Sequence, residues 1–438
     1  MRMSTVVTDA QVEPPEPPEP TDAELAVRGE MSARRRGGFG IASIVLGAIM
    51  IRAFGLGSES GLDATFVFNK RGESTLPDLV LPARETCLVL GLIAVLLGAA
   101  LVTGLLRRRT YLVFGIVLAL FVVALLAWAA RGDSVSILGL FQGTLFKAVP
   151  LALGALAGLM CERSGVINIG IEGMLLTAAF TGALTASAAD SVWIGMFSGI
   201  AIGALLGALL AVLSIRYRVD QIIGGTVINI LALGLTSYLG TQVLAEYPDL
   251  NEPGSFQPLG IPLLQDIPFF GPLLFDRTIY VYLMFALVFG LAWALYRTRW
   301  GLRIRAVGEH PGAADTVGIN VLATRYRSVI TGGAIAGLAG TWFTLDAVSG
   351  FNEEMTAGRG FIALAALIFG RWHPVGAFIA ALVFGFAEEL QGRLALLNTP
   401  IPSEILLATP YIVTIIVVAG LVGRSRPPAA DGQIYERS

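Results

Sequence analysis

The chain has 438 residues, of which 55% are hydrophobic and 14% charged, and its formal net charge at pH 7 is −2. This composition excludes a soluble globular protein and predicts an all-α, polytopic membrane protein that lies in a lipid bilayer. The near-neutral charge argues against nucleic acid as a partner. Two cysteines, Cys87 and Cys161, are too few for a disulfide framework or a cysteine metal site, and no metal is expected.

The sequence shows no nucleotide chemistry of its own. Neither lysine, Lys70 or Lys147, follows a glycine, so the Gly-Lys-Ser/Thr of a phosphate-binding loop is missing. No nucleophile, base and acid combine into a catalytic arrangement either. We therefore expect no catalytic residue, no enzyme activity and no cofactor on this chain, and any ATP and Mg²⁺ to be bound by a partner subunit.

Residues 1–37 contain an acidic proline run, EPPEPPEP, and an arginine triplet at Arg34 to Arg36. This composition predicts a disordered tail, and the arginines favour the cytoplasmic side of the membrane. Apolar segments long enough to span a bilayer follow. They fall at 38–56, 87–106, 111–130, 138–160, 166–188, 192–215, 222–245, 278–297, 328–348, 361–370, 374–391 and 404–423.

About 10–12 transmembrane or half-membrane helices are expected in total, because some of these segments are short. Residues 38–137 hold extra N-terminal helices and loops, 138–423 hold the core, and 424–438 form a second tail. Basic residues gather in alternate loops, which predicts that both termini are cytoplasmic.

Two long loops differ from simple connectors. Residues 246–277 carry five acidic residues and six prolines. This loop is expected outside the membrane, where it either receives an extracytoplasmic binding protein or only joins two spans. Residues 297–327 carry six arginines, and Pro311 and Gly318 delimit a short helix predicted over Pro311–Val317. We expect this cytoplasmic loop to be a docking surface for a partner.

Two apolar segments are interrupted by polar or helix-breaking residues. Segment 164–188 contains Asn168 and Glu172, and segment 358–391 contains glycines and a proline around a core too short to span. Broken helices occur within membranes only where they line protein or a cavity, so we place the translocation path between these segments. The costly carboxylate of Glu172 is expected to pair with Arg163 or Lys147, either in the path or as a structural ion pair.

Other polar and aromatic side chains leave two interpretations open. Asn168 and Asn229 can bind a polar solute or hold helices together. Phe343 and the nearby aromatic residues can stack on a planar solute. Glu388 and Glu389, near an outer helix end, are expected to be solvated.

A glycine stripe on one helix and a pair on another predict close helix packing, within the subunit rather than between subunits: Gly195, Gly199, Gly203 and Gly207, with Gly333 and Gly337.

At residues 162–174 the sequence ERSGVINIGIEGM closely resembles the signature of membrane permease subunits from bacterial ABC importers for nucleosides. These belong to the ribose and branched-chain amino-acid permease superfamily. Residues 301–320, GLRIRAVGEHPGAADTVGIN, are similar to the ATPase-docking loop of that superfamily. The resemblance covers roughly residues 140–423 and implies an ABC importer permease fold in a bacterial plasma membrane.

The resemblance also implies partners and residue roles. A second permease chain, either another copy or a paralogue, ATPase subunits and an extracytoplasmic substrate-binding lipoprotein are expected. The substrate path is expected to include Asn168, Gly170, Glu172 and Gly173, to which the residues themselves add Asn229 and Phe343. The ATPase-coupling residues are expected to be Glu309, Pro311, Ala313, Ala314, Asp315 and Gly318. Family members often have Asn in place of His310, so a looser start is expected for that helix.

Three alternatives remain at this level. The same machine could carry a ribose-like sugar or a branched-chain amino acid. A secondary transporter driven by an ion gradient would need several ionisable groups at the membrane midplane, where only Lys147 and Glu172 are candidates. A non-transporting scaffold would not need broken helices.

Overall fold

The computed structural model describes residues 32–70, 75–397, 399, 402, 404–405, 408 and 426–436. Within these ranges the regular structure is helical apart from five short strands, and turns and loops join these elements. The chain divides into two compact units. The described residues of the first lie within 32–66 and 79–135, and those of the second lie within 67–70, 75–78 and 136–436.

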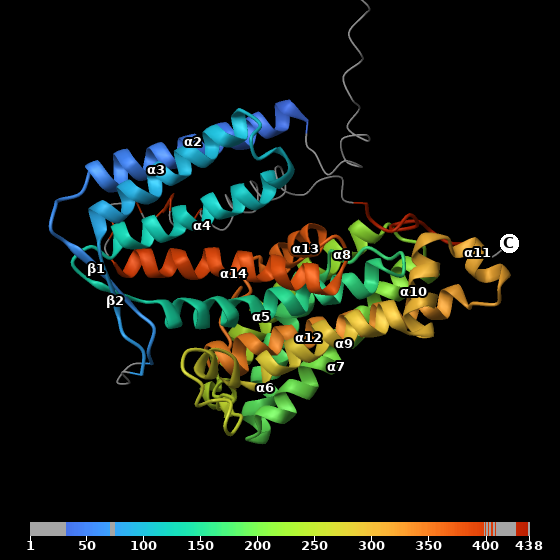
Figure 1. The fold of residues 1–438 in the computed structure, drawn as a ribbon. Coiled ribbons are helices and arrows are strands. Elements are labelled where there is room, and N and C mark those ends of the chain that lie inside the picture. The colour runs from blue at the N-terminus through green and yellow to red at the C-terminus, as the bar shows by residue number, and fades with distance from the viewer. Residues whose placement is uncertain are drawn as a thin grey trace, which may run out of the picture. The chain divides into compact units, whose positions relative to one another are not determined.

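The first unit is built on three long helices that pack side by side (Figure 1). Its elements are α2 (Ala33–Ile49), η1 (Met50–Leu56), β1 (Asp63–Val67), β2 (Leu79–Pro82), α3 (Ala83–Val102), η2 (Arg107–Arg109), α4 (Thr110–Ala129) and β3 (Ser134–Ser136). The strands form a small sheet in the order β2-β1-β3, in which Ala64 pairs with Leu81. Helix α2 begins five residues earlier than predicted and includes the arginine triplet.

Glycines let α2 and α3 approach each other closely. A Cβ atom added to Gly47 would lie 2.7 Å from the carbonyl oxygen of Gly91. One added to Gly40 would lie 2.9 Å from the carbonyl oxygen of Gly98. Because small residues allow helix backbones to meet within a membrane, these two contacts explain why the pair is so closely packed.

The second unit contains the remaining elements of the chain. They are α5 (Ile137–Glu162), α6 (Ile171–Ala189), α7 (Val192–Ala211), η3 (Val212–Arg216), α8 (Gln221–Leu239), η4 (Gly240–Leu244), η5 (Pro248–Asn251), β4 (Leu259–Gly260), η6 (Gly271–Phe275), β5 (Asp276–Arg277), α9 (Ile279–Arg297), α10 (Arg299–Glu309), α11 (Pro311–Thr316), α12 (Val321–Trp342), η7 (Phe343–Ala347), α13 (Arg359–Phe369) and α14 (Pro374–Leu396).

In the described residues, 10 helices are long and apolar enough to cross a membrane, and α13 is a shorter apolar helix. This confirms the all-α polytopic class. The predicted span 404–423 lies almost entirely outside the described residues. In the second unit two predicted starts were also wrong: α6 begins at Ile171 because a turn occupies the residues before it, and α12 begins at Val321, seven residues before the predicted 328.

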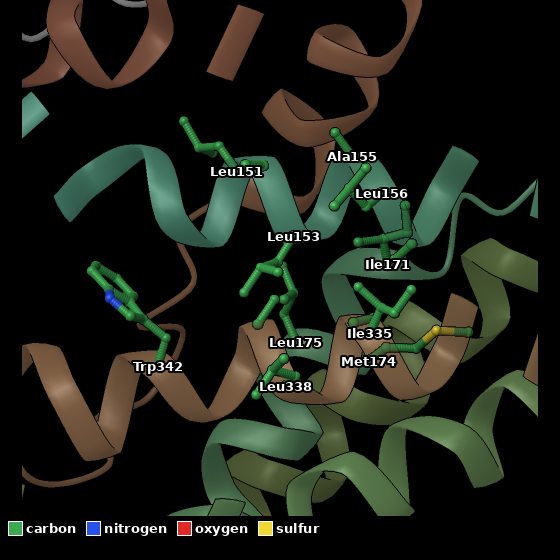
Figure 2. Packing of buried hydrophobic residues seen from close by; sticks show 14 of the residues in the cluster. Leu151, Leu153, Ala155, Leu156, Ile171, Met174, Leu175, Ile335, Leu338 and Trp342 are labelled. Carbon is green, nitrogen blue, oxygen red and sulfur yellow. The ribbon is translucent and has the colours of Figure 1, made fainter. Parts of the chain in front are cut away.

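Helices α5, α6 and α12 form the centre of this unit. In the 18-residue apolar stretch of each membrane span, 89% is buried for α5, 83% for the span that begins with α12, and only 28% for the span that begins with α8. Protein therefore encloses α5 and α12 on nearly all sides. Figure 2 shows Leu153 of α5, Leu175 of α6 and Leu338 of α12 meeting in this core. A helix that is apolar all round is expected in such a buried position.

The glycine stripe on α7 packs against the glycine pair on α12. A Cβ atom added to Gly203 would lie 2.6 Å from the Cα atom of Gly337, and one added to Gly207 would lie 2.8 Å from the carbonyl oxygen of Val329. The two backbones are therefore in direct contact. The prediction that these glycines serve packing within the subunit is confirmed.

Candidate functional site

Glu172 lies in the first turn of α6 and binds the beginning of α13. Its Oε1 accepts hydrogen bonds from the Thr356 hydroxyl at 2.6 Å and the Gly358 N–H at 2.8 Å. Its Oε2 accepts one from the Gly360 N–H at 2.6 Å. The first N–H groups of a helix have no partner within the helix, and their dipoles favour a negative charge. The Glu172 carboxylate of α6 therefore caps α13, a short apolar helix that lies far from α6 in the sequence.

The glycines at this contact are needed for its geometry. Gly358 has a φ of +79°, which side chains with a Cβ atom disfavour. A Cβ atom added to Gly360 would lie 2.6 Å from the Cα atom of Glu172. The two interrupted segments that the sequence analysis singled out thus meet directly at Glu172.

The predicted cationic partners of Glu172 were wrong. Lys147 forms an ion pair with Glu389 at 3.2 Å. Arg163 donates two hydrogen bonds to the carbonyl oxygen of Trp372, at 2.6 and 2.8 Å, and lies 3.9 Å from Glu309. Backbone N–H groups satisfy the Glu172 carboxylate instead, so it needs no cation.

A cavity of about 320 Å³ opens beside this contact, between α6, α8 and the start of α13. Its walls are Glu172, Gly173, Leu176, Asn229, Ile230, Leu233, Glu354, Thr356, Ala357, Gly358 and Phe361. Three predicted path residues, Glu172, Gly173 and Asn229, therefore line one cavity. Because its walls are mainly neutral and its central carboxylate is already hydrogen-bonded, the cavity suits weak binding of a neutral polar solute.

Asn229 lines the cavity and also holds two helices together. Its Oδ1 accepts a hydrogen bond from the Gly173 N–H at 2.8 Å, and its Nδ2 donates one to the Ile169 carbonyl oxygen at 3.0 Å. A Cβ atom added to Gly173 would lie 2.9 Å from the Cα atom of Asn229. The side chain thus joins α8 to the start of α6, as one of the two interpretations from sequence expected.

The other three predicted path residues are not among those that line this cavity. Asn168 is fully buried in the turn before α6, where its Nδ2 lies 3.5 Å from the Cys161 sulfur. Gly170 packs against the backbone of Gly225. Phe343 is 3% exposed, and the Arg359 guanidinium lies 5.7 Å from its ring centroid, so it is enclosed rather than open to a solute.

The prediction that Glu388 and Glu389 are solvated was wrong. Glu388 pairs with Arg359 at 2.5 Å, and Glu389 pairs with Lys147 and with Arg393 at 2.7 Å. The carboxylate side chains are only 18% and 12% exposed. Burial of paired charges in apolar surroundings avoids the cost that a single charge would carry.

The 297–327 loop contains two helices, α10 and α11, of which only the second was predicted. Pro311 stands at the first position of α11, and Gly318 follows its end with a φ of +83°. The looser start expected from His310 stays a prediction, and the residue does cap α11, because its Nδ1 accepts a hydrogen bond from the Ala313 N–H at 3.2 Å. An imidazole nitrogen therefore takes the place of the usual cap oxygen.

The expected coupling residues all lie on or beside these two helices. Glu309 ends α10, and Pro311, Ala313, Ala314 and Asp315 belong to α11. Ala314 is 3% exposed and packs with Val307 and Val321 in a small apolar cluster. This cluster fixes α11 against α10 and the start of α12.

The end of α10 contacts the turn between α5 and α6. A Cβ atom added to Gly308 would lie 2.9 Å from the carbonyl carbon of Arg163. Arg325, one of the six arginines of residues 297–327, belongs to α12, donates a hydrogen bond to the Ser164 carbonyl oxygen at 3.1 Å and is only 2% exposed. This turn leads directly into α6 and so to Glu172.

The C-terminal residues 426–436 return to the same turn, an arrangement that the sequence analysis did not foresee. Ala430 is 2% exposed, and its N–H donates to the Gly308 carbonyl oxygen at 2.8 Å. Burial raises the pKa of the neighbouring Asp431 to about 7, while the Gly432 N–H and Arg325 act to lower it. Glu162 and Cys161, at the end of α5, also face this carboxyl.

The binding of this segment to the turn should depend on pH. The raised pKa of Asp431 means that the bound segment takes up a proton, so binding weakens as pH rises from about 4 to about 7. We expect the Ala430 amide to be better protected from hydrogen exchange at pH 6 than at pH 8, after correction for the intrinsic exchange rate. Asp431→Asn should remove the difference. A difference that persists in this variant would contradict the prediction.

The fold and the half-helix site define a multi-pass membrane permease, and comparison with known proteins gives the family. Residues 140–419 match the family described as "Branched-chain amino acid transport system / permease component", and the chain belongs to it. It is therefore a permease component of an ABC transporter. Such subunits are not enzymes, because ATP hydrolysis lies on separate subunits.

Curated relatives support the same class. The guanosine ABC transporter permease protein NupQ of Bacillus subtilis is 41% identical over 313 residues, which cover 69% of this chain and 98% of NupQ. The nucleoside ABC transporter permease protein NupC of Lactococcus lactis is 38% identical over 305 residues, covering 67% and 95%. No solved structure gives a significant match. The family match begins at residue 140, so α2, α3 and α4 lie outside it.

Proposed function

We propose that this chain is the membrane subunit of an ATP-driven importer for nucleosides. The main structural support for a role in transport is a continuous series of contacts. It runs from α10, through the Arg163–Gly165 turn, to Glu172 and the cavity. The similarity to NupQ and NupC supports a nucleoside as cargo. Apart from Glu172 and Glu354, the walls of the cavity are uncharged, which suits a sugar joined to a base, since such a solute carries no formal charge.

The proposed partners follow from this role. Separate ATPase subunits bind α10 and α11, a second permease chain completes the pore, and an extracytoplasmic lipoprotein delivers the nucleoside. The subunit lies in a bacterial plasma membrane with both termini in the cytoplasm. The arginines of Arg107–Arg109, Arg216 and the 297–327 loop, on one side of the proposed topology, support this orientation.

The proposed cycle is alternating access. Closure of the ATPase subunits moves α10 and α11, and Gly308 transmits the movement to the turn before α6. Because Glu172 holds the start of α13, a shift of α6 changes the hydrogen bonds that close one side of the cavity. The solute is then released from a site that binds it only weakly.

A sugar is the second candidate cargo. The glucose ABC transporter permease protein TsgB13 of Haloferax volcanii is 27% identical over 267 residues, covering 55% of this chain and 66% of that protein. A gradient-driven transporter is disfavoured because family membership assigns the energy source to ATP. In addition, the ionisable groups Lys147, Arg359, Glu388 and Glu389 are engaged in ion pairs.

Uptake of labelled guanosine and adenosine, by cells with and without this chain, tests the proposal directly. Nucleoside uptake should disappear with the chain, be abolished by vanadate and be unaffected by unlabelled ribose or leucine. Loss of ribose or leucine uptake instead would move the chain to another branch of the family. Uptake that resists vanadate would contradict an ATP-driven mechanism.

The coupling surface gives a second test. Glu309→Ala combined with Asp315→Ala should lower uptake and ATPase stimulation by roughly tenfold, because it removes two side chains of the proposed contact and a few residues usually carry most of an interface's binding energy. A matched control is Glu59→Ala with Asp78→Ala, since both acidic residues are exposed and precede the family match that begins at residue 140. The control should transport normally. Normal ATPase stimulation in the first variant would exclude this docking assignment.

A further inference from the structure

The C-terminal segment 428–436 is seated against the elements proposed to meet the ATPase. The Ala429 N–H donates to Glu309 at 3.2 Å, and the Ala430 N–H donates to Gly308 at 2.8 Å. The segment therefore binds the last turn of α10 along its backbone. Its side chains also reach α11, because Tyr435 packs against the apolar cluster that contains Ala314.

The same segment is held from the other side by residues of the membrane core. Arg325 donates a hydrogen bond to the Gln433 carbonyl oxygen at 2.8 Å. A Cβ atom added to Gly432 would lie 2.8 Å from Ile167, in the turn before α6. Glu436 pairs with Arg218 at 2.5 Å, although this exposed pair contributes little stability. Contacts to three separate elements give the segment a defined position.

The outer side of this arrangement leaves apolar side chains uncovered. Ile434 of the segment is 50% exposed, and Val317, next to α11, is 75% exposed. Glu309, at the end of α10, is also exposed, with 55% of its side chain accessible. Apolar groups surrounded by charged ones are typical of a protein–protein interface.

We propose that residues 428–436 form part of the docking surface for the ATPase subunit, together with α10 and α11. The inference rests on the proposed function, which supplies the partner. It follows from continuity, since the segment is hydrogen-bonded to the helix proposed to meet the ATPase and carries the exposed apolar side chain of Ile434. Movement of the ATPase then reaches the turn before α6 by two routes, through Gly308 and through the C-terminal segment.

The test measures binding of the ATPase subunit to purified permease in lipid nanodiscs. Ile434→Asp should weaken binding about tenfold, because it places a charge at an apolar contact of the interface. The control is Leu263→Asp, since Leu263 is 85% exposed on the 246–277 loop, and its binding should be unchanged. Removal of residues 427–438 should weaken binding at least as much. Thermal unfolding of Ile434→Asp should match the unaltered chain, because the side chain is at the surface.

The outcomes separate this inference from the proposed function. If Ile434→Asp binds the ATPase normally while Glu309→Ala with Asp315→Ala binds weakly, the C-terminal segment is not part of the docking surface. If the unaltered chain binds no ATPase, the proposed function fails and this inference fails with it. Weakened binding by both variants, with normal binding by Leu263→Asp, supports the composite surface.

Discussion

Replacement of Glu172 by alanine is expected to lower nucleoside uptake by at least about tenfold. The carboxylate accepts three hydrogen bonds from Thr356, Gly358 and Gly360, at 2.6 to 2.8 Å. Hydrogen bonds to a charged group contribute roughly 1.5–3 kcal/mol each, and roughly 1.4 kcal/mol already corresponds to a tenfold change in rate. Without the carboxylate, the start of α13 would lose its cap and its connection to α6.

Two further variants distinguish a role in transport from a role in folding. Glu172→Gln keeps the size of the side chain and one acceptor oxygen but sets an NH₂ group against a backbone N–H, so uptake should be intermediate. Glu353→Gln is the matched control, because Glu353 is exposed on the loop before α13 and does not line the cavity. Uptake, thermal unfolding and membrane yield should be measured for all three. Normal uptake by Glu172→Ala would exclude the proposed link between α6 and α13.

The sequence located the two segments that meet at the site, but it did not identify what joins them. A carboxylate among apolar residues and a short helix between glycines are both visible in the sequence. Two of the three donors to Glu172 are backbone N–H groups, those of Gly358 and Gly360, which are 186 and 188 residues away in the sequence. Backbone groups have no residue type of their own, so a search for a cationic partner led to Arg163 and Lys147 instead.

The coupling region was predicted where local signals were strong. Pro311 and Gly318 mark the ends of α11 through backbone rules that act within a few residues. Helix α10 was missed because its arginines were read only as evidence for a loop, although Ile304 and Val307 have helical spacing and are buried. The return of the C-terminal segment could not be predicted, since it depends on long-range backbone contacts.

The site residues differ in how closely their type determines their position. Asn229 could bind solute or join helices, and its amide geometry makes it join α6 to α8 at the cavity wall. Phe343 was chosen for its ring, but an aromatic residue in a membrane helix more often packs than binds. In the structure it lies beneath Arg359, which comes from α13 and pairs with Glu388 of α14, and sequence alone does not bring α13 next to Phe343.

The contact between α7 and α12 gives the largest expected effect on stability. In Gly203→Ala the new methyl group would lie 2.6 Å from the Cα atom of Gly337 and would also meet the Gly333 carbonyl oxygen. Cβ atoms do not approach backbone atoms so closely, so the helices must separate. Overpacking of a well-packed core costs about 1–3 kcal/mol, and α12 is a central helix, so the midpoint of thermal unfolding in detergent should fall by several degrees.

The matched control for this prediction is Gly290→Ala on α9. No atom lies within 4 Å of the position that its new methyl group would take. Alanine in a helix interior is favoured over glycine by roughly 0.5–1 kcal/mol, so this variant should unfold at the same temperature or slightly higher. The two substitutions are chemically identical and differ only in the backbone that faces them. Equal unfolding temperatures for both would therefore show that α7 and α12 do not meet through their glycines.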